Sequence, residues 1–164
     1  MREGLQTRGV GAGQTSPSVR TTEIILDNNY AKKAKSFIES AVSEIRICAY
    51  AWRWYDSEPE LEIQQFNLEL LKACRRNLQV RILVDTEAMS KKFNDLGFQT
   101  RAVQNTRMLH TKAIVIDRKT LIIGSHNLTK RANSDNYELS VAIQEFEPVE
   151  QFINYFDRIW QSRG

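Results

Sequence analysis

The chain alternates between short apolar runs rich in β-branched residues and longer segments whose apolar residues recur at helical spacing. The short runs predict buried strands, and the longer segments predict amphipathic helices. The expected strands cover 21–26, 44–52, 79–85, 113–116, 121–123 and 137–143, with a weak strand after Gly97. The expected helices cover about 28–42, 57–76, 88–96 and 148–160, and a polar stretch covers 129–136. This alternation predicts an α/β fold, an α-β-α sandwich around a central sheet.

Two features refine this outline. The helix at 57–76 is expected to start at a capping box, Ser57-x-x-Glu60. The strands 113–116 and 121–123 are separated only by Asp117-Arg118-Lys119-Thr120, which predicts an antiparallel hairpin with a tight polar turn. An antiparallel hairpin among strand–helix–strand units makes the sheet mixed.

Polar residues cluster at the open end of this hairpin. Residues two apart on a strand point to the same face, so His110 and Lys112 are expected to project together. Ser125 ends the second strand, and Asn127 follows it. An imidazole, an ammonium, a hydroxyl and a carboxamide can converge there, and that set suits a phosphate group.

The stretch from His110 to Asn127, HTKAIVIDRKTLIIGSHN, resembles the HKD signature of the phospholipase D superfamily, and the small bacterial Nuc-type endonucleases in particular. The six matching positions are His110, Lys112, Asp117, Gly124, Ser125 and Asn127. Glu138, eleven residues past the asparagine, fits the same pattern. In this pattern Asp117 and Gly124 are expected to be structural, with Asp117 bracing the turn. The alternative is a buried hairpin in which histidine and lysine occur by chance.

The resemblance implies catalytic roles for five residues. Lys112 and Asn127 would hold the non-bridging phosphate oxygens, and Ser125 would line the same pocket. Glu138 would accept a hydrogen bond from the far nitrogen of His110 and so fix its tautomer. No metal or cofactor is implied, because the lysine and two imidazoles supply the positive charge.

Enzymes of this superfamily pair two such motifs around one site. One histidine forms a phosphohistidine, and the other protonates the leaving oxygen. Because this chain carries a single motif, the resemblance implies a homodimer in which His110 of each copy faces the other across a two-fold axis. His126, at a variable position of the motif, is interpreted as a loop residue and not as the acid.

The net charge of +3 is unevenly distributed. The segment 101–131 carries +6, from seven basic residues and one acid, and the remainder carries −3. The basic residues are Arg101, Arg107, Lys112, Arg118, Lys119, Lys130 and Arg131. A basic collar suits a polyanionic substrate, with Arg118, Lys130 and Arg131 as outer contacts. The alternative is a solvated surface whose charges follow the strand ends.

An aromatic loop, Trp52-Arg53-Trp54-Tyr55, follows the end of a predicted strand, where ligands meet α/β sheets. Trp52, Arg53 and Trp54 are therefore candidates for stacking on bases or flanking the scissile strand. Packing at the dimer interface or at the core edge is the alternative.

Length and composition bound the rest. With 164 residues, 41% hydrophobic and 26% charged, the chain suits one globular domain. We expect a flexible tail at 1–20 and a phospholipase D-like catalytic domain at 21–164. No apolar run has the length of a membrane span, and the start has no signal-peptide pattern, although a trimmed signal is an alternative. Cys48 and Cys74 are expected to be buried reduced thiols of a cytoplasmic protein without a zinc site.

Three functions follow as hypotheses. The first is a metal-independent endonuclease that cleaves DNA without sequence preference, with RNA as a further substrate. The second is a phospholipase D-type lipid phosphodiesterase or phosphatidyl transferase. The third is a binding module without turnover, which the complete set of motif residues disfavours.

Overall fold

The computed structural model describes residues 21–103 and 107–163. The tail expected at 1–20 lies outside the described residues.

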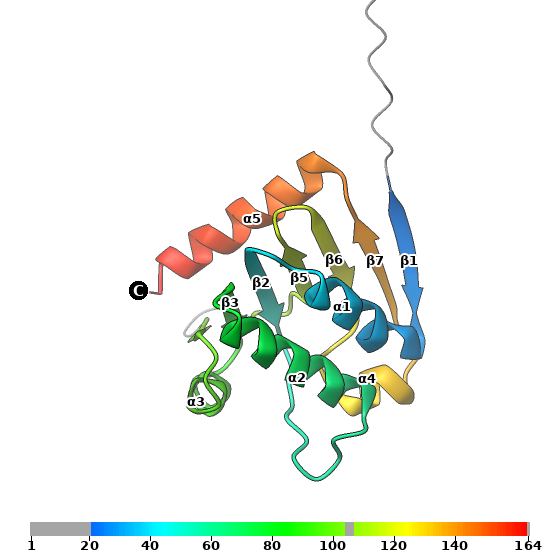
Figure 1. Ribbon diagram of the computed structural model, residues 1–164. Helices are drawn as coiled ribbons and strands as arrows, with labels where there is room; N and C mark the ends of the chain where they lie inside the picture. The colour runs from blue at the N-terminus through cyan, green and yellow to red at the C-terminus, as the bar shows by residue number, and fades with distance from the viewer. Residues whose placement is uncertain (1–20, 104–106, 164) are drawn as a thin grey trace, which may run out of the picture.

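One mixed sheet of seven strands forms the centre of the molecule, in the order β1-β7-β6-β5-β2-β3-β4 (Figure 1). The strands are β1 (Thr22–Leu26), β2 (Glu44–Ala49), β3 (Gln79–Val84), β4 (Thr100–Ala102), β5 (Ala113–Ile116), β6 (Thr120–Gly124) and β7 (Leu139–Ile143). β2, β3 and β4 are parallel to one another, whereas β5, β6, β7 and β1 continue the sheet with antiparallel pairings. The predicted mixed sheet and its hairpin, β5–β6, are confirmed.

Helices cover both faces of the sheet. They are α1 (Tyr30–Glu39), α2 (Glu62–Arg75), α3 (Glu87–Asp95), α4 (Lys130–Ser134) and α5 (Phe146–Gln161), and a short 3₁₀ turn, η1 (Asp27–Asn29), precedes α1. Figure 1 shows α1 and α2 on one face and the long α5 crossing the other. This arrangement confirms the predicted α-β-α sandwich.

The structure corrects the predicted start of α2 and adds a short helix, α4, to the polar stretch before β7. α2 begins at Glu62, and its N-cap residue Leu61 makes no side-chain capping bond, so Ser57-x-x-Glu60 is not a capping box. The segment forms turns instead, because Glu58 N donates to Tyr55 O and Leu61 N donates to Glu58 O. The polar stretch at 129–136 contains α4, whose first turn Thr129 caps by accepting from Ala132 N.

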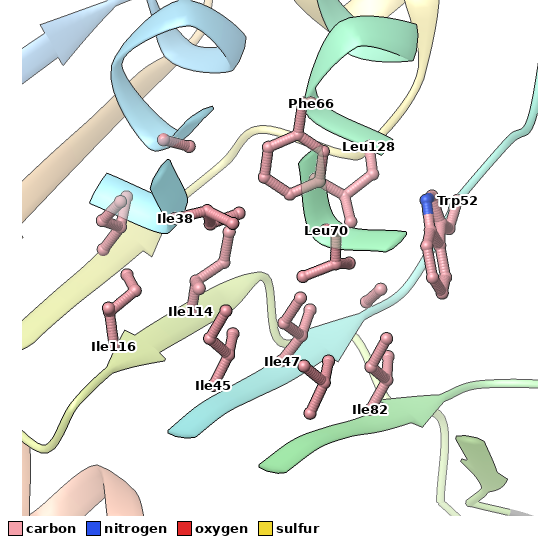
Figure 2. Packing of buried hydrophobic residues seen from close by; sticks show 14 of the residues in the cluster. Ile38, Ile45, Ile47, Trp52, Phe66, Leu70, Ile82, Ile114, Ile116 and Leu128 are labelled. Atoms are coloured by element: carbon pink, nitrogen blue, oxygen red, sulfur yellow. The ribbon is translucent and has the colours of Figure 1, made fainter. Parts of the chain in front are cut away.

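The larger part of the core lies between the sheet and α1 and α2. Alternate strand residues point to this side, as the period of two requires. Figure 2 shows residues that fill this layer: Ile38, Ile45, Ile47, Phe66, Leu70, Ile82 and Ile114. Each is fully buried. Burial of one apolar side chain of this size stabilises the fold by roughly 1.5–3 kcal/mol.

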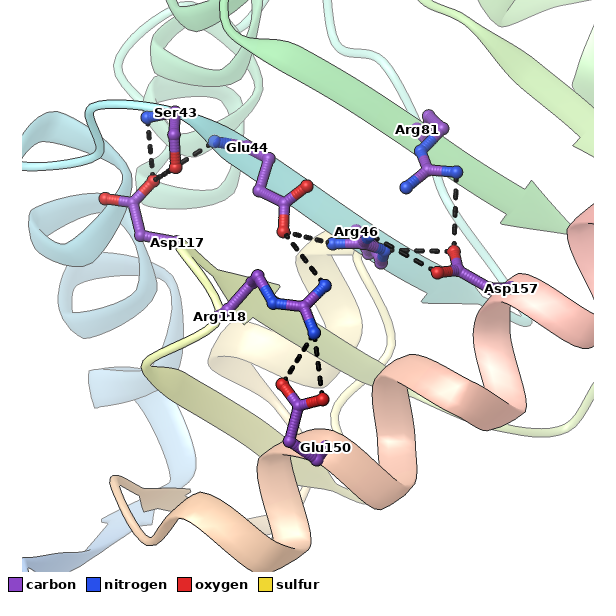
Figure 3. A network of polar contacts seen from close by, with 8 residues as sticks. All are labelled: Ser43, Glu44, Arg46, Arg81, Asp117, Arg118, Glu150 and Asp157. Atoms are coloured by element: carbon purple, nitrogen blue, oxygen red, sulfur yellow. Dashed lines mark hydrogen bonds and ion pairs between the residues drawn. The ribbon is translucent and has the colours of Figure 1, made fainter.

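The opposite face of β2 carries Arg46, which is only 3% exposed because α5 covers it. Its guanidinium pairs with Glu44 and with Asp157 of α5, at 2.5 and 3.1 Å (Figure 3). Arg81 of β3 reaches the same Asp157 at 3.3 Å. Ionic contacts therefore anchor α5 to the sheet. The buried charge of Arg46 is paired with two carboxylates, as a buried charge requires.

The turn between β5 and β6 is held by one carboxylate. Asp117 accepts hydrogen bonds from Ser43 N, Glu44 N and Ser43 Oγ at 2.8, 3.1 and 2.8 Å (Figure 3). It also accepts from Val42 N at 2.9 Å. Asp117 and Arg118 both have positive φ, 51° and 55°, as primed hairpin turns require. Burial would raise the pKa of the Asp117 carboxyl, but these hydrogen bonds outweigh it and hold the pKa below its usual value.

Asp117→Ala is expected to lower the free energy of unfolding by about 2–3 kcal/mol, because charge-assisted hydrogen bonds are lost and their donors are left unpaired. The lowered pKa means that the stabilisation is present above the unfolded value of 3.8 and is lost as the pH falls through the lower folded value. Urea titrations at pH 7 and pH 3 measure both effects. Asp95→Ala, at an exposed residue, should change stability by less than about 0.5 kcal/mol, and an equal loss in both variants would contradict the assignment.

Candidate active site

The motif residues gather at one edge of the sheet, the lower end in Figure 1, where β2, β3 and β6 end and β5 and β7 begin. The hairpin turn lies at the other end. Carboxyl ends of parallel strands are where α/β sheets bind ligands, so the location agrees with the predicted phosphate chemistry.

His110 and Lys112 lie together, just before β5 begins. The imidazole of His110 is exposed, and Lys112 is half-buried. Lys112 Nζ donates to the backbone carbonyl of His110 at 2.8 Å. Burial lowers the pKa of Lys112, and the charge of Glu138 opposes that shift. The ammonium is thus partly desolvated and lies within the field of a carboxylate.

Tyr50 joins these two residues, and the sequence reasoning missed it. Its ring centroid is 4.5 Å from that of His110, with a tilt of 57°, and 4.8 Å from Lys112 Nζ. The second contact has the distance of a cation–π interaction. Tyr50 directly follows β2, and its position at a strand end was the available signal.

Asp85, directly after β3, holds the chain that leads into the motif. Its Oδ1 accepts from the backbone N–H of Leu109 at 2.7 Å. Leu109 is itself 3% exposed, so both its main chain and its side chain are anchored. Asp85 therefore fixes the residue before His110 without contacting the imidazole in the described structure.

Ser125 and Glu138 form a pair across β6 and β7. Ser125 Oγ donates to the Glu138 carboxylate and accepts from Leu139 N at 3.1 Å. The other carboxylate oxygen accepts from Asn136 Nδ2 at 2.9 Å. This differs from the expected contact with His110: within the described residues, Glu138 makes no hydrogen bond to that ring. The pairing of β6 with β7 brings the Glu138 carboxylate next to Ser125 and not next to His110.

Asn127 also lies at this edge and is half-buried. Its backbone carbonyl accepts from Asn133 Nδ2 at 3.2 Å, whereas its side-chain Oδ1 is buried and has no hydrogen-bond partner among the described residues. A buried amide oxygen without a partner is uncommon in folded proteins. The side chain is thus not committed to the fold through that atom.

Gly124 allows the close approach of β6 and β7 beside the motif residues. A Cβ at this position would lie 2.3 Å from both Leu139 O and Ser140 Oγ. Any side chain would therefore push the strands apart.

Residues 34–160 match a protein family described as "Cardiolipin synthase, PLD-like domain". The chain belongs to this phospholipase D-like family. It is 30% identical over 128 residues to mitochondrial cardiolipin hydrolase of Mus musculus, covering 74% of this chain and 54% of that protein. It is 34% identical over 96 residues to phospholipase D of Rickettsia felis, covering 54% and 48%. The chain therefore spans about half the length of these curated relatives.

Two solved structures share the phospholipase D-like fold over nearly their whole length. Nuc from Salmonella typhimurium, a phospholipase D family member, has a TM-score of 0.71 and 23% identity, covering 86% of this chain and 95% of that one. NucT from Helicobacter pylori has a TM-score of 0.72 and 16% identity, covering 87% and 97%. These similarities show the fold and confirm the predicted resemblance to the Nuc proteins.

The aromatic loop beside the phospholipase D-like motif is mostly structural. Trp52 is 4% exposed, stacks on Phe93 with ring centroids 3.4 Å apart, and donates to Asn67 Oδ1 at 2.8 Å. The prediction that Trp52 stacks on substrate bases is therefore wrong, because its faces are already covered. Trp54 is half-buried and donates to Asp56 at 2.7 Å. Arg53 is exposed beside Leu128, which follows Asn127.

Arg118 is not near the motif histidine, which corrects a second prediction. It lies in the turn at the far end of β5, roughly 13 Å along a four-residue strand, where it binds Glu150 of α5 at 2.8 Å (Figure 3). Arg101 is also engaged elsewhere, because it stacks on Trp160 at 4.3 Å. The basic segment of the sequence is therefore divided in space.

Of the predicted outer basic contacts, Arg53, Lys130 and Arg131 remain candidates at the site end. All three are exposed, and Lys130 pairs with Glu58. Within the described residues, Arg53 and Arg131 form no ion pair. Arg131 lies four residues after the motif asparagine, and the backbone N–H of Arg53 donates to the carbonyl oxygen of Leu128, the residue after that asparagine, at 3.0 Å.

The described residues contain no group of three His, Cys, Asp or Glu side chains that could hold a metal ion. None of their helices is both long enough and apolar enough to cross a membrane. Cys48 and Cys74 are free; Cys48 is buried as expected, whereas Cys74 is only half-buried.

Proposed function

We propose that residues 21–164 form a phosphodiesterase domain in which His110 attacks phosphorus and forms a phosphohistidine. The observation that carries the proposal is the exposed imidazole of His110 beside Lys112 on the ring of Tyr50. Phosphodiester cleavage needs a nucleophile, an acid for the leaving oxygen and positive charge for the equatorial oxygens. The motif supplies each of these without a metal when two copies face each other.

Within this proposal, Lys112 and Asn127 bind the non-bridging oxygens, and Ser125 lines the pocket. Glu138 supports the pocket through its hydrogen bond with Ser125 and its charge near Lys112. In a dimer the carboxylate has a second candidate partner, the imidazole of the other copy.

An uncovered apolar surface supports the proposed homodimer. Ile24 pairs with Val141 and Leu26 with Leu139, so these side chains share the face of the sheet that α5 covers elsewhere. Ile24, Leu26 and Leu139 are 63%, 49% and 51% exposed. Leu139 directly follows Glu138, so this β1–β7 surface extends up to the site. A second copy seated there would lie next to the pocket that needs its histidine.

Ile24→Glu is expected to convert a dimer to monomers in sedimentation and to lower activity at the same protein concentration, because it places a charge within the β1–β7 surface. Val42→Glu is the matched control, since Val42 is 77% exposed near the hairpin turn at the other end of the sheet. It should leave assembly and activity unchanged. A monomeric Ile24→Glu protein with full activity would refute the shared site.

Nucleic acid is the proposed substrate, cleaved without sequence preference in the cytoplasm. The exposed cations of Arg53, Lys130 and Arg131 at the site end suit a polyanion longer than one phosphate. The similarity to Nuc and NucT over nearly their whole length supports the same choice. The free thiols of Cys48 and Cys74 agree with a reducing compartment.

A lipid phosphodiester is the second candidate. Met108, two residues before the motif histidine, is 65% exposed, and Tyr137, directly before Glu138, is fully exposed. Apolar side chains on both sides of a phosphate site can contact acyl chains. Curated relatives named phospholipase D and cardiolipin hydrolase support this alternative.

The deciding experiment offers single-stranded DNA, duplex DNA, RNA and cardiolipin vesicles to the protein in excess EDTA. Cleavage of nucleic acid, with binding that weakens steeply as salt rises, is the expected result. Hydrolysis of cardiolipin with intact nucleic acids would overturn the nuclease assignment in favour of the lipid. No turnover of any of the four would overturn the phosphodiesterase.

A further inference from the structure

A second histidine is buried within the motif itself. His126 stands between Ser125 and Asn127 and is 1% exposed. Its Nδ1 lies 2.8 Å from Ser140 Oγ, and its Nε2 lies 2.9 Å from the backbone carbonyl oxygen of Asp27. Both ring nitrogens are thus used within the fold, which leaves neither available for proton transfer to a substrate.

These contacts distinguish the two neutral tautomers of the ring. A carbonyl oxygen only accepts, so Nε2 of His126 carries the hydrogen, and Nδ1 accepts from the Ser140 hydroxyl. Tyr30 stacks on the ring at 4.4 Å, with planes 10° apart. Burial lowers the pKa of His126, although the Asp27 carbonyl and the charges of Glu138 and Asp27 oppose the shift. A neutral ring with its hydrogen on Nε2 satisfies both contacts, and the burial that lowers the pKa favours this form over the imidazolium.

Asp27 links the His126 ring to the main chain of Glu138. Its backbone N–H donates to Glu138 O at 3.0 Å, and its Oδ1 accepts from Glu138 N at 2.9 Å. Asp27 adopts a positive φ of 47°, an unusual conformation for a residue with a side chain. The main chain of Glu138 is therefore held on both sides by a residue whose own carbonyl is bonded to His126.

Ser140 links the ring to the other strand of the pocket. Its Oγ lies only 2.3 Å from the position that a Cβ on Gly124 would take. The hydroxyl that donates to His126 thus packs against the backbone directly before Ser125. The ring joins the end of β6, the start of β7 and the β1–α1 junction.

We propose that His126 is a positioning residue that sets the distances among the pocket residues around it. Those residues are Ser125, Asn127 and Glu138. It touches no substrate and transfers no proton. The inference rests on the proposed phosphodiesterase function, and it predicts a loss in kcat with little change in KM. Displacing reacting groups by about 1 Å can cost on the order of 10²-fold in rate.

His126→Phe tests this inference, because phenylalanine keeps a flat ring for Tyr30 and removes both hydrogen bonds. With bis(p-nitrophenyl) phosphate as the probe, kcat should fall about 10–100-fold while KM changes less than about twofold. His126→Gln, which can still donate to the Asp27 carbonyl, should recover part of the loss. A folded His126→Phe protein with wild-type kcat would overturn the inference.

A matched pair of serine variants keeps the test valid if the phenylalanine variant does not fold. Ser140→Ala removes the donor to the ring, whereas Ser90→Ala removes a comparably buried hydroxyl, 3.0 Å from Thr100 Oγ1, between α3 and β4. We expect similar losses of Tm in both variants and a lower kcat only in Ser140→Ala. Equal effects on kcat would show a merely structural role.

The tautomer itself can be measured without substrate. The chain has two histidines, so ¹⁵N-histidine-labelled His110→Ala protein reports on His126 alone. We expect a neutral ring protonated at Nε2 that stays neutral as the pH is lowered through 6.5, its ordinary pKa. The titratable groups around it are those of Asp27, Tyr30, Cys48, Lys112 and Glu138.

Protonation of the His126 ring near pH 6.5, or a neutral ring with its hydrogen on Nδ1, would overturn this assignment. If this spectrum is as expected but wild-type protein cleaves no phosphodiester, the proposed function is overturned and the arrangement of the ring is not. The two failures are therefore distinguishable.

Discussion

His110→Ala is expected to lower turnover of the cleaved phosphodiester by at least about 10⁴-fold, because it removes nucleophile and acid together from a symmetric site. The variant should fold normally, since the imidazole is exposed and its main contact is the ring of Tyr50. The measurement is cleavage in excess EDTA, with circular dichroism and Tm recorded beside it. A folded variant that retains more than about 1% of the activity would contradict the proposed nucleophile.

Mixing this variant with wild-type protein tests whether two copies share one site. After joint refolding of equal amounts, random pairing gives about one quarter wild-type homodimers. The mixture should therefore have about a quarter of the activity of the same total amount of wild-type protein. Independent subunits would retain half. A result near one half would refute the shared site while leaving His110 as the nucleophile.

Lys112→Met is expected to lower kcat/KM by about 10²–10³-fold, because it removes the cation nearest the imidazole from a partly desolvated position. Methionine keeps the unbranched stem against Tyr50 and loses only the charge and its hydrogen bond. Steady-state kinetics with the preferred substrate measure the loss.

Lys119→Met is the matched control for that variant. It makes the same change of charge in the same basic segment, but at the hairpin turn, at the other end of β5. Its kcat/KM should stay within about twofold of wild type. Equal losses in both variants would mean that overall charge, and not placement beside His110, determines activity.

The parts of the site that the sequence predicted are those set by local chain geometry. The period of two and the short polar turn determine the β5–β6 hairpin, so the positions of His110, Lys112 and Ser125 at one edge follow from the spacing alone. The predicted strands and most of the predicted helices rest on the same periodicities.

The errors arise where distant segments decide the environment. Trp52 is buried because Phe93, forty-one residues later, supplies a stacking partner, and nothing in the local sequence shows this. Arg118 follows His110 by only eight residues, but β5 runs between them and places Arg118 at the opposite end of the sheet. Glu138 meets Ser125 through the register of β6 with β7, which spacing along the chain does not specify. Tyr50 was missed for the same reason, since its role depends on where the motif folds back.

The pairing of Asp27 with Glu138 joins positions 111 residues apart, and β1 pairs with β7 across similarly long separations, from Leu26 with Leu139 to Thr22 with Ile143. A chain that grows from its amino end on a ribosome therefore cannot assemble the pocket until β7 has left the exit tunnel. Long-range closure of this kind comes late in folding. A nascent chain of this protein would hold His110 in an incomplete site from the synthesis of that residue until β7 pairs with β6 and β1, and the activity would begin only after this strand is in place.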